Sequence, residues 1–198
     1  MQNNINDNIA IYDKICVDYI AETFDKFNQE AVEKFLSNVD GTEKILELGT
    51  GSGNNLTYMF GQGKNIHGSD NVLGFYEWIT TRFACPFSLI DFADVRFVNS
   101  FVNDYDIDHL FCNLALQHLS HEEFLFFIQR VKFKGVFYFS LYDGRGESYD
   151  EQGIFSAYYK HRQITKLLEE RFDIKDHWFS DDTLGSDKKM LNYIVKLK

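Results

Sequence analysis

The fold of this chain is decided by the stretch Lys44-Ile45-Leu46-Glu47-Leu48-Gly49-Thr50-Gly51-Ser52-Gly53-Asn54-Asn55. Its apolar run, residues 45–48, ends at a glycine, which predicts a buried strand followed by a sharp turn. Gly49, Gly51 and Gly53 let a ligand approach the backbone closely, because glycine has no Cβ. Asn54 and Asn55 are typical first residues of a helix. We therefore expect a strand, a glycine turn and a helix start that cradle a small ligand at the carboxyl end of a sheet.

The spacing of the glycines separates the possible ligands. A dinucleotide fingerprint needs glycine at the first, third and sixth places of the turn, but the sixth place here holds Asn54. The chain also has no Tyr-x-x-x-Lys pair, so an NAD-linked oxidoreductase is a disfavoured alternative. A turn with no ligand is disfavoured as well, because three alternate glycines carry an entropy cost.

An acidic residue followed by G-x-G-x-G, as in Glu47-Leu48-Gly49-Thr50-Gly51-Ser52-Gly53, resembles motif I of the class I S-adenosylmethionine (SAM) methyltransferases. The resemblance implies that the loop passes under the methionine part of SAM, whose product form is S-adenosylhomocysteine. It also implies that Glu47 holds the amino end of the cofactor through loop backbone or water, and that Gly49, Thr50 and Gly51 contact the cofactor.

Length and composition favour a single globular domain over residues 1–198. The chain is 44% hydrophobic and 17% aromatic, and a chain of this size buries about 70% of its unfolded surface. We see no basic leader and no run of about 18 apolar residues, so we expect a cytoplasmic protein without a membrane span. A net charge of −10 without any basic cluster argues against nucleic acid as a partner.

Three cysteines, Cys16, Cys85 and Cys112, are widely spaced and form no C-x-x-C pair. This pattern argues against a disulfide framework and fits a reducing compartment. It also argues against a zinc site, so we expect no metal. The sequence makes no prediction of the oligomeric state.

Two helices are predicted ahead of the motif, at residues 12–27 and 28–40, from apolar side chains at helical spacing. The polar residues up to about Asn8 are expected to be disordered. We expect the two helices, within residues 9–40, to lie across the cofactor end of the sheet. Tyr12-Asp13 followed by Tyr19 resembles the opening of many small-molecule methyltransferases, which implies that Tyr19 contacts the cofactor and Tyr12 the acceptor. Plain core packing is the alternative for each tyrosine.

Asp70 is the polar residue that the sequence marks most clearly for a role. It ends a short predicted strand, residues 65–69, about 17 residues after Gly53. An ionised carboxylate at a strand end offers two acceptor oxygens to a ribose diol. The methyltransferase resemblance implies the same role for Asp70, with Asn71 beside it on the cofactor.

A third strand is predicted at Val95–Asn99, after a helix at residues 72–83. In the methyltransferase family this strand is usually followed by a small residue and an Asp that reads the adenine amino group. Here Ser100 and Phe101 follow, with no acid before Asp104. We therefore expect Ser100 to bond the adenine or Phe101 to stack on it.

The block Asp108-His109-Leu110-Phe111-Cys112-Asn113-Leu114-Ala115-Leu116-Gln117-His118-Leu119 resembles the fourth-strand motif of small-molecule methyltransferases. The resemblance implies that Asn113 and Leu114 contact the cofactor and that Asn113 and His118 lie nearest the reacting groups. A histidine pKa near 6.5 suits a general base at neutral pH, although His118 could instead only bond backbone and pack. Enzymes that methylate DNA or glutamine amino groups carry Asn-Pro-Pro-Tyr or Asp-Pro-Pro-Tyr here, so the missing prolines exclude that class.

The second half of the chain is predicted to complete a doubly wound α/β sheet. We expect a helix opened by a Ser120–Glu123 capping box, a buried strand, a last helix and two paired strands, the last four at Gly135–Leu141, Ile164–Arg171, Ile174–Phe179 and Met190–Leu197. The resemblance implies a mainly parallel seven-stranded sheet of order 3-2-1-4-5-7-6, with one antiparallel strand and helices on both faces.

The polar stretch at residues 142–151 is expected to be a mobile loop beside the active site. Together with residues 154–159 it looks like the "EGxGE … Phe-x-x-Tyr-Tyr" loop of bacterial small-molecule methyltransferases. This likeness implies that Tyr142, Arg145 and Tyr158 face the acceptor, and that Tyr142 is an alternative to His118 for deprotonating it. For Arg145, a solvated loop position is the other interpretation.

These motifs together predict a SAM-dependent methyltransferase that acts on a small-molecule acceptor. A non-catalytic SAM-binding or interaction protein of the same fold is the main alternative, because no catalytic constellation is evident. A macromolecular acceptor has no basic groove or added domain to bind it. The acceptor and the atom that is methylated are not encoded in any motif.

Overall fold

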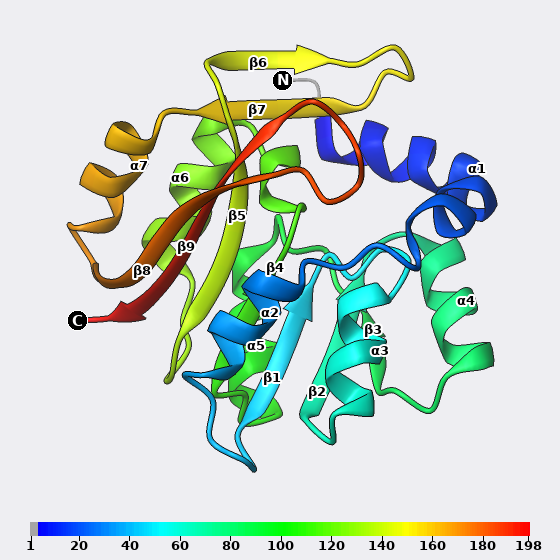
Figure 1. Ribbon diagram of the computed structural model, residues 1–198, viewed down its shortest axis with the longest axis horizontal. Coiled ribbons are helices and arrows are strands. Elements are labelled where there is room, and N and C mark those ends of the chain that lie inside the picture. The colour runs from blue at the N-terminus through cyan, green and yellow to red at the C-terminus, as the bar shows by residue number, and fades with distance from the viewer. Residues whose placement is uncertain (1–3) are drawn as a thin grey trace.

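The glycine turn follows the central strand of a nine-stranded sheet (Figure 1). In the computed structural model, which describes residues 4–198, β1 (Lys44–Leu48) lies between β2 (Asn65–Asp70) and β4 (His109–Cys112) and runs parallel to both. The order is β3-β2-β1-β4-β5-β7-β6, and β9 pairs with both β5 and β8. The other strands are β3 (Phe87–Leu89), β5 (Phe137–Asp143), β6 (Gly146–Tyr149), β7 (Phe155–Tyr159), β8 (Phe172–Asp181) and β9 (Lys189–Leu197).

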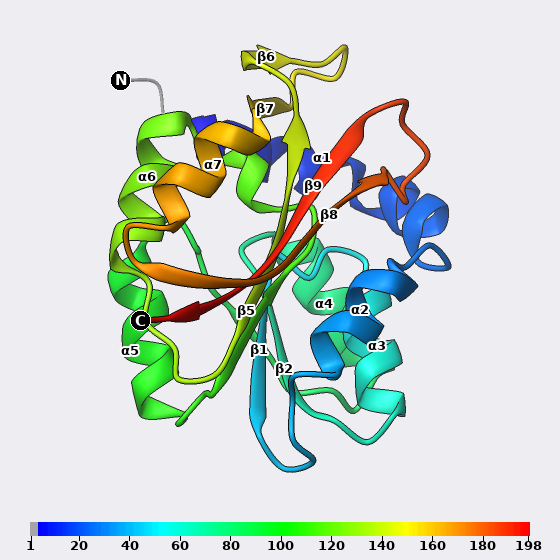
Figure 2. The same cartoon turned by 60° about the vertical axis from the view of Figure 1, so that its left-hand side comes forward.

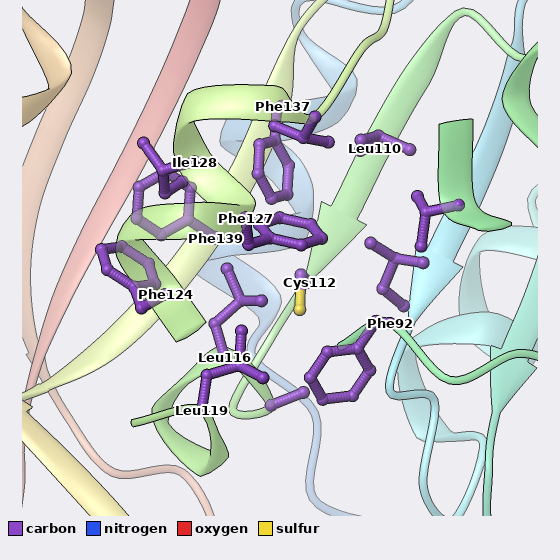
Figure 3. Packing of buried hydrophobic residues seen from close by; sticks show 14 of the residues in the cluster. Phe92, Leu110, Cys112, Leu116, Leu119, Phe124, Phe127, Ile128, Phe137 and Phe139 are labelled. Carbon is purple, nitrogen blue, oxygen red and sulfur yellow. The ribbon is translucent and has the colours of Figure 1, made fainter. Parts of the chain in front are cut away.

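Helices cover both faces of this sheet, as expected for a doubly wound fold. Figure 2 separates α2 (Gln29–Leu36), α3 (Asn54–Gly61) and α4 (Leu73–Arg82) from α5 (Val95–Asp104), α6 (His121–Arg130) and α7 (His161–Leu168). The strands supply both cores because successive side chains point to opposite faces: Leu46 and Leu48 join one cluster and Ile45 joins the other. Figure 3 shows the larger cluster, where rings from α6 and β5 pack together.

Seven strands follow the predicted order, with β9 and β8 in the places of the seventh and sixth. β9 is antiparallel to β5, and β8 pairs with its far side. The two additional strands are β6 and β7, which form an antiparallel hairpin in the region that we expected to be a mobile loop. The two glycines at positions 144 and 146 favoured the prediction of a loop, although β6 begins at Gly146. The hairpin joins the sheet because Tyr142 pairs with Tyr158 in parallel register.

The third strand is Phe87–Leu89, so the prediction of a strand at Val95–Asn99 was wrong. Those residues begin α5, whose N-cap is Asp94, and the Asp94 carboxylate accepts the backbone N–H groups of the first turn. The buried side chains of this helix recur at steps of three and four, at Val95, Val98, Phe101 and Val102. The β-branched residues suggested a strand, but the cap and the helical burial determine the structure.

The first helix, α1 (Asn4–Thr23), begins inside the segment that we expected to be disordered. Residues 1–3 of that segment lie outside the described residues. Asn8 is buried and fastens α1 to β7, because its side chain accepts the N–H of Phe155 at 2.8 Å and donates to the Phe155 carbonyl at 3.0 Å. These bonds, rather than an apolar stripe, order the start of the helix.

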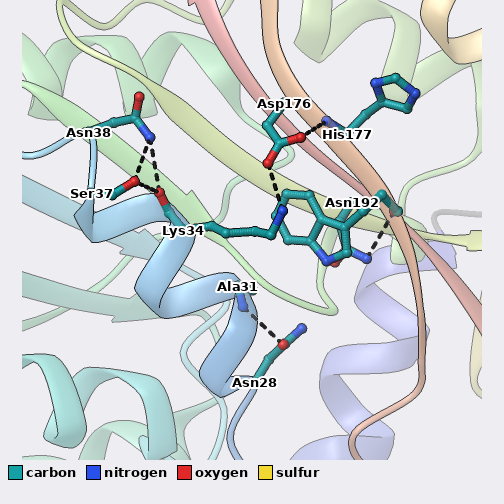
Figure 4. A network of polar contacts seen from close by, with 9 residues as sticks. Asn28, Ala31, Lys34, Ser37, Asn38, Asp176, His177 and Asn192 are labelled. Atoms are coloured by element: carbon teal, nitrogen blue, oxygen red, sulfur yellow. Dashed lines mark hydrogen bonds and ion pairs between the residues drawn. The ribbon is translucent and has the colours of Figure 1, made fainter.

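Of the two predicted N-terminal helices, α1 crosses the carboxyl ends of the strands (Figure 1). The second predicted helix, α2, packs against a face of the sheet, where Val32 and Phe35 contact the cluster around Phe111. Asn28 caps α2, and Lys34 forms an ion pair with Asp176 of β8 at 2.8 Å (Figure 4). The expectation that both helices cover the ligand end therefore holds for α1 alone. None of the helices in residues 4–198 has the length and apolar character needed to cross a membrane.

Candidate functional site

The glycine turn after β1 has a backbone that other residues rarely adopt. Gly49, Gly51 and Gly53 have φ angles of 69°, 57° and 90°, all in the left-handed region that favours glycine. A Cβ on Gly49 would lie 2.3 Å from the Cβ of Ala115, and one on Gly53 would lie 2.1 Å from Ile79 Cδ1. A Cβ on Gly51 would meet only the ring of Tyr19, at 3.6 Å. The turn therefore packs tightly on two sides and presents bare backbone towards Tyr19.

Asp70, at the end of β2, binds this turn and the start of the next segment. One carboxylate oxygen accepts the N–H of Gly51 at 2.8 Å, and the other accepts those of Asn71 and Val72 at 2.8 and 3.1 Å. The side chain is buried, and burial raises the pKa of the Asp70 carboxyl although the three N–H donors act to lower it. A carboxylate oxygen has more than one acceptor site, so Asp70 can also bind hydroxyl groups.

Two adjoining cavities meet over the glycine turn. The larger is lined by Asp70, Asn71, Phe92, Ala115 and His118 and covered by Tyr12 and Tyr19 of α1. The smaller is lined by Thr50, Asn54, Asn55, Asn113 and Leu184. Tyr19, Gly49, Gly51 and Leu114 line both. The sequence motifs after β1, β2 and β4 thus converge on one elongated site.

Glu47 lies beneath the turn as a buried acid with an unused acceptor. Its side chain is 1% exposed, and within the described chain Oε2 has no hydrogen-bond partner. Burial raises the pKa of Glu47 to about 8, although hydrogen bonds from the Thr50 and Asn55 side chains oppose the shift. Thr50 and Asn55 line the smaller cavity, so these two side chains lie between the Glu47 carboxyl and that cavity.

Glu47→Gln is expected to stabilise the protein relative to wild type at pH 9 but much less at pH 5. The folded wild type keeps the Glu47 proton up to about pH 8, whereas the unfolded chain loses it above about pH 4.3. Stability from this group is therefore complete below the unfolded pKa and is lost as the pH rises through the folded pKa, by roughly 1.4 kcal/mol per pKa unit. Urea unfolding at both pH values measures the difference, and an equal effect at pH 5 and pH 9 would contradict the assignment.

Asn113 and Leu114 turn the chain from β4 into the site. Asn113 Oδ1 accepts hydroxyl groups of Tyr138 and Ser140 at 3.0 and 3.1 Å, and the Ser140 hydroxyl accepts the N–H of Leu114 at 2.8 Å. Leu114 has a φ of 55°, a strained conformation for a branched residue. These hydrogen bonds stabilise the strained backbone of the turn. Leu114 lines both cavities.

His118, in the 3₁₀ turn η1 (Leu116–His118), has a defined tautomer. Its Nδ1 lies 2.8 Å from the carbonyl oxygen of Phe155, which fixes the hydrogen on Nδ1, so that Nε2 accepts the hydroxyl of Tyr12 at 3.2 Å. Burial lowers the pKa of His118, so the imidazole is neutral near pH 7. The site therefore holds a neutral base whose acceptor nitrogen faces the roof of the larger cavity.

Ser100 and Phe101 lie on α5 and line a separate groove with Tyr76 and Tyr105, so they belong to neither cavity. An acid, Asp91, does follow the true third strand, β3, by two residues. Its Oδ1 accepts the N–H of Ala93 at 2.9 Å and lies 3.4 Å from the amide nitrogen of Asn71. A third strand predicted directly after Pro86 would have drawn attention to Asp91 and Phe92 as the residues that follow its end.

The acceptor-side candidates separate into two groups. Tyr142 ends β5 and stacks on Tyr158 with ring centres 5.7 Å apart. Burial raises the pKa of Tyr142 far above its ordinary value, so the phenol stays protonated at neutral pH and cannot serve as a ready base. Arg145 is exposed between β5 and β6. None of Tyr142, Arg145 and Tyr158 lines either cavity. In the described part of the chain no cluster of metal-ligating side chains is found.

Comparison with solved structures identifies the fold. A SAM-dependent methyltransferase from Anabaena variabilis superposes with a TM-score of 0.75 at 10% identity, covering 96% of this chain and 95% of that one. The 1,6-didemethyltoxoflavin-N1-methyltransferase of Burkholderia thailandensis, solved with 1,6-didemethyltoxoflavin and S-adenosylhomocysteine, gives 0.70 at 14% identity, covering 98% and 90%. A SAM-dependent methyltransferase from Clostridium acetobutylicum gives 0.61 at 16% identity, covering 98% of both chains.

These likenesses confirm the fold that the motif I resemblance implied. At such low identity they establish the architecture, and the activity has to be argued from the residues of this chain. No protein-family model matches the sequence, and no curated protein matches it.

Proposed function

We propose that this chain is a SAM-dependent methyltransferase that transfers the sulfonium methyl group to a small-molecule acceptor by in-line displacement. The observation that carries the proposal is the meeting of Asp70, the bare backbone of Gly51 and the turn at Leu114 in one site at the carboxyl edge of the parallel sheet. Ligands bind at this edge in open α/β sheets.

The residues present fit SAM. Asp70 suits the ribose diol, with Asn71 beside it, and Asp91 and Phe92 suit the adenine. The smaller cavity, with Thr50 and Asn113 in its wall, suits the methionine part. The unused oxygen of Glu47 beneath this cavity provides negative charge for an ammonium group once the acid ionises. Tyr19 covers both parts, where its ring face favours a cation.

When bound, SAM supplies a methyl carbon already activated by the sulfonium, so the protein mainly has to align the acceptor and exclude water. Acceptor deprotonation is assigned to His118, whose Nε2 takes the proton directly or through the Tyr12 hydroxyl. The Phe155 carbonyl, which also accepts the Asn8 amide, holds the Nδ1 side of the ring and so keeps Nε2 directed at Tyr12.

The proposal is tested by incubating the protein with SAM and a library of small acceptors and measuring S-adenosylhomocysteine. Turnover distinguishes an enzyme from a protein that only binds SAM, which would release no S-adenosylhomocysteine with any acceptor. Activity is expected to persist below pH 6.5, because burial lowers the pKa of His118 below the ordinary histidine value.

His118→Asn is expected to lower kcat by about 100-fold or more while leaving SAM affinity nearly unchanged. Asparagine keeps a donor for the Phe155 carbonyl but has no basic nitrogen. His121→Asn is the matched control, because His121 is an exposed neighbour whose Nε2 bonds the Tyr158 carbonyl at 3.0 Å outside both cavities. Equal kcat values for the two variants would remove His118 as the base.

A further inference from the structure

Lys188 lies at the end of the β8–β9 connection, residues 182–188, and its ammonium group is unpaired in the described structure. Its Nζ lies 4.2 Å from the ring centre of Tyr142 and 5.8 Å from that of Tyr158. Two nearby lysines are neutralised instead: Lys160 Nζ lies 3.1 Å from Asp143 Oδ1, and Lys189 pairs with Asp181. Among the described residues no carboxylate oxygen lies within 4.0 Å of Lys188 Nζ.

The backbone fixes Lys188 in this place. The N–H of Asp182 donates to the Lys188 carbonyl at 3.0 Å, and the Asp182 carboxylate accepts the N–H of Leu184 at 2.9 Å. Lys188 precedes Met190 by two residues, and Met190 pairs with Tyr142 in the β5–β9 ladder. Lys188 immediately precedes β9, and the start of the β5–β9 ladder brings its Nζ over the ring of Tyr142.

The same connection borders the site. Leu184 lines the smaller cavity, and the charge of Lys188 acts on His118, as does that of Asp150 in the β6–β7 turn. Lys188 therefore lies on the acceptor side, near the tyrosines that the sequence predicted for that role.

The acidic side chains on this side of the site already have donors. Asp150 Oδ1 accepts the N–H groups of Gln152 and Ile154, both at 2.9 Å. Asp182 accepts the N–H of Leu184 and the hydroxyl of Ser186, and Asp70 accepts three N–H groups. The hydrogen-bonding capacity of the Lys188 ammonium group is thus not used by a carboxylate. A cation on a ring face gains little compared with an ion pair to a partly desolvated anion.

We propose that Lys188 is a specificity-determining residue that binds an anionic group, a carboxylate in the simplest case, on the methyl acceptor. The inference rests on the proposed function, since it assigns the acceptor class to that site. Tyr142 and Tyr158 would flank the apolar part of the same acceptor, and the protonated Tyr142 hydroxyl can donate a further hydrogen bond.

The test uses protein loaded with S-adenosylhomocysteine and a set of small carboxylates, including benzoate and phenylacetate, each matched with its primary amide. Binding is measured by ligand-observed NMR at millimolar concentration for wild type, Lys188→Met, Lys188→Arg and Lys189→Met. We expect wild type, Lys188→Arg and Lys189→Met to prefer the carboxylates by about tenfold, and Lys188→Met to lose that preference. S-adenosylhomocysteine affinity is expected to be unchanged in all four.

Equal binding of acids and amides by wild type, absence of carboxylate binding, or a preference that survives in Lys188→Met would each overturn the inference. A preference for amines that Asp150→Asn abolishes would overturn it too, by assigning the site to a cationic acceptor. Failure of the proposed function is a separate result: either S-adenosylhomocysteine would not bind to the wild type, or SAM would yield no S-adenosylhomocysteine with any acceptor.

Discussion

Replacing Asp70 with alanine is expected to weaken SAM binding by about two orders of magnitude or more. The carboxylate orders the turn through Gly51, Asn71 and Val72, and in the proposed complex it also accepts the ribose hydroxyls. A hydrogen bond to a charged group contributes about 1.5–3 kcal/mol, so loss of two such bonds accounts for an effect of this size. Titration calorimetry of wild type and Asp70→Ala measures it.

Asp94→Ala provides the matched control for this substitution. Asp94 also accepts two backbone N–H groups, those of Arg96 and Phe97, but it caps α5 at an exposed position. Its removal is expected to cost about 1 kcal/mol of stability, as for other N-caps, without a change in SAM affinity. If Asp70→Ala and Asp94→Ala bound SAM equally well, the ribose role of Asp70 would be wrong.

Gly49→Ala is expected to destabilise the fold by roughly 3 kcal/mol and to abolish cofactor binding. The substitution forces a Cβ to within 2.3 Å of Ala115 and places alanine at a φ of 69°. The left-handed conformation costs about 1–2 kcal/mol, and overpacking adds about 1–3 kcal/mol. Ala115 cannot yield by a side-chain rotation, so the turn itself must move.

Gly63→Ala separates the two contributions. Gly63 has a similar φ of 74°, but a Cβ there would meet nothing within 4 Å. It should therefore show only the backbone cost, about 1 kcal/mol, and normal binding. Urea unfolding and calorimetry of both variants check this difference, and equal destabilisation would show that packing against Ala115 contributes nothing.

The sequence predicted those parts of the site that follow from local chemistry. The alternate glycines after β1, the acid at the end of β2 and the block after β4 predict that Glu47, Gly51, Asp70, Asn113 and His118 lie near one another, because the carboxyl ends of parallel strands share one edge. These residues lie in or beneath the two adjoining cavities. Each of these motifs lies in or directly after a strand of the parallel sheet, so recognising the motif also locates its residues in the fold.

The remaining parts depend on tertiary contacts. The run Val95–Asn99 has β-branched residues but becomes helical through the Asp94 cap and its buried face. For this reason the adenine prediction fell on Ser100, which lines a separate groove. Polar Asn8 is ordered only because it bonds Phe155 across the molecule. Lys188 reaches the tyrosines through the pairing of β9 with β5. No local pattern carries this information.

The most direct test of the central claim is a calorimetric titration of the wild-type protein with S-adenosylhomocysteine, alongside a titration with NADH. The glycine turn, Asp70 and the two adjoining cavities predict binding of one S-adenosylhomocysteine per chain and no binding of NADH. Binding of NADH without S-adenosylhomocysteine, or of neither ligand, would contradict the proposed function.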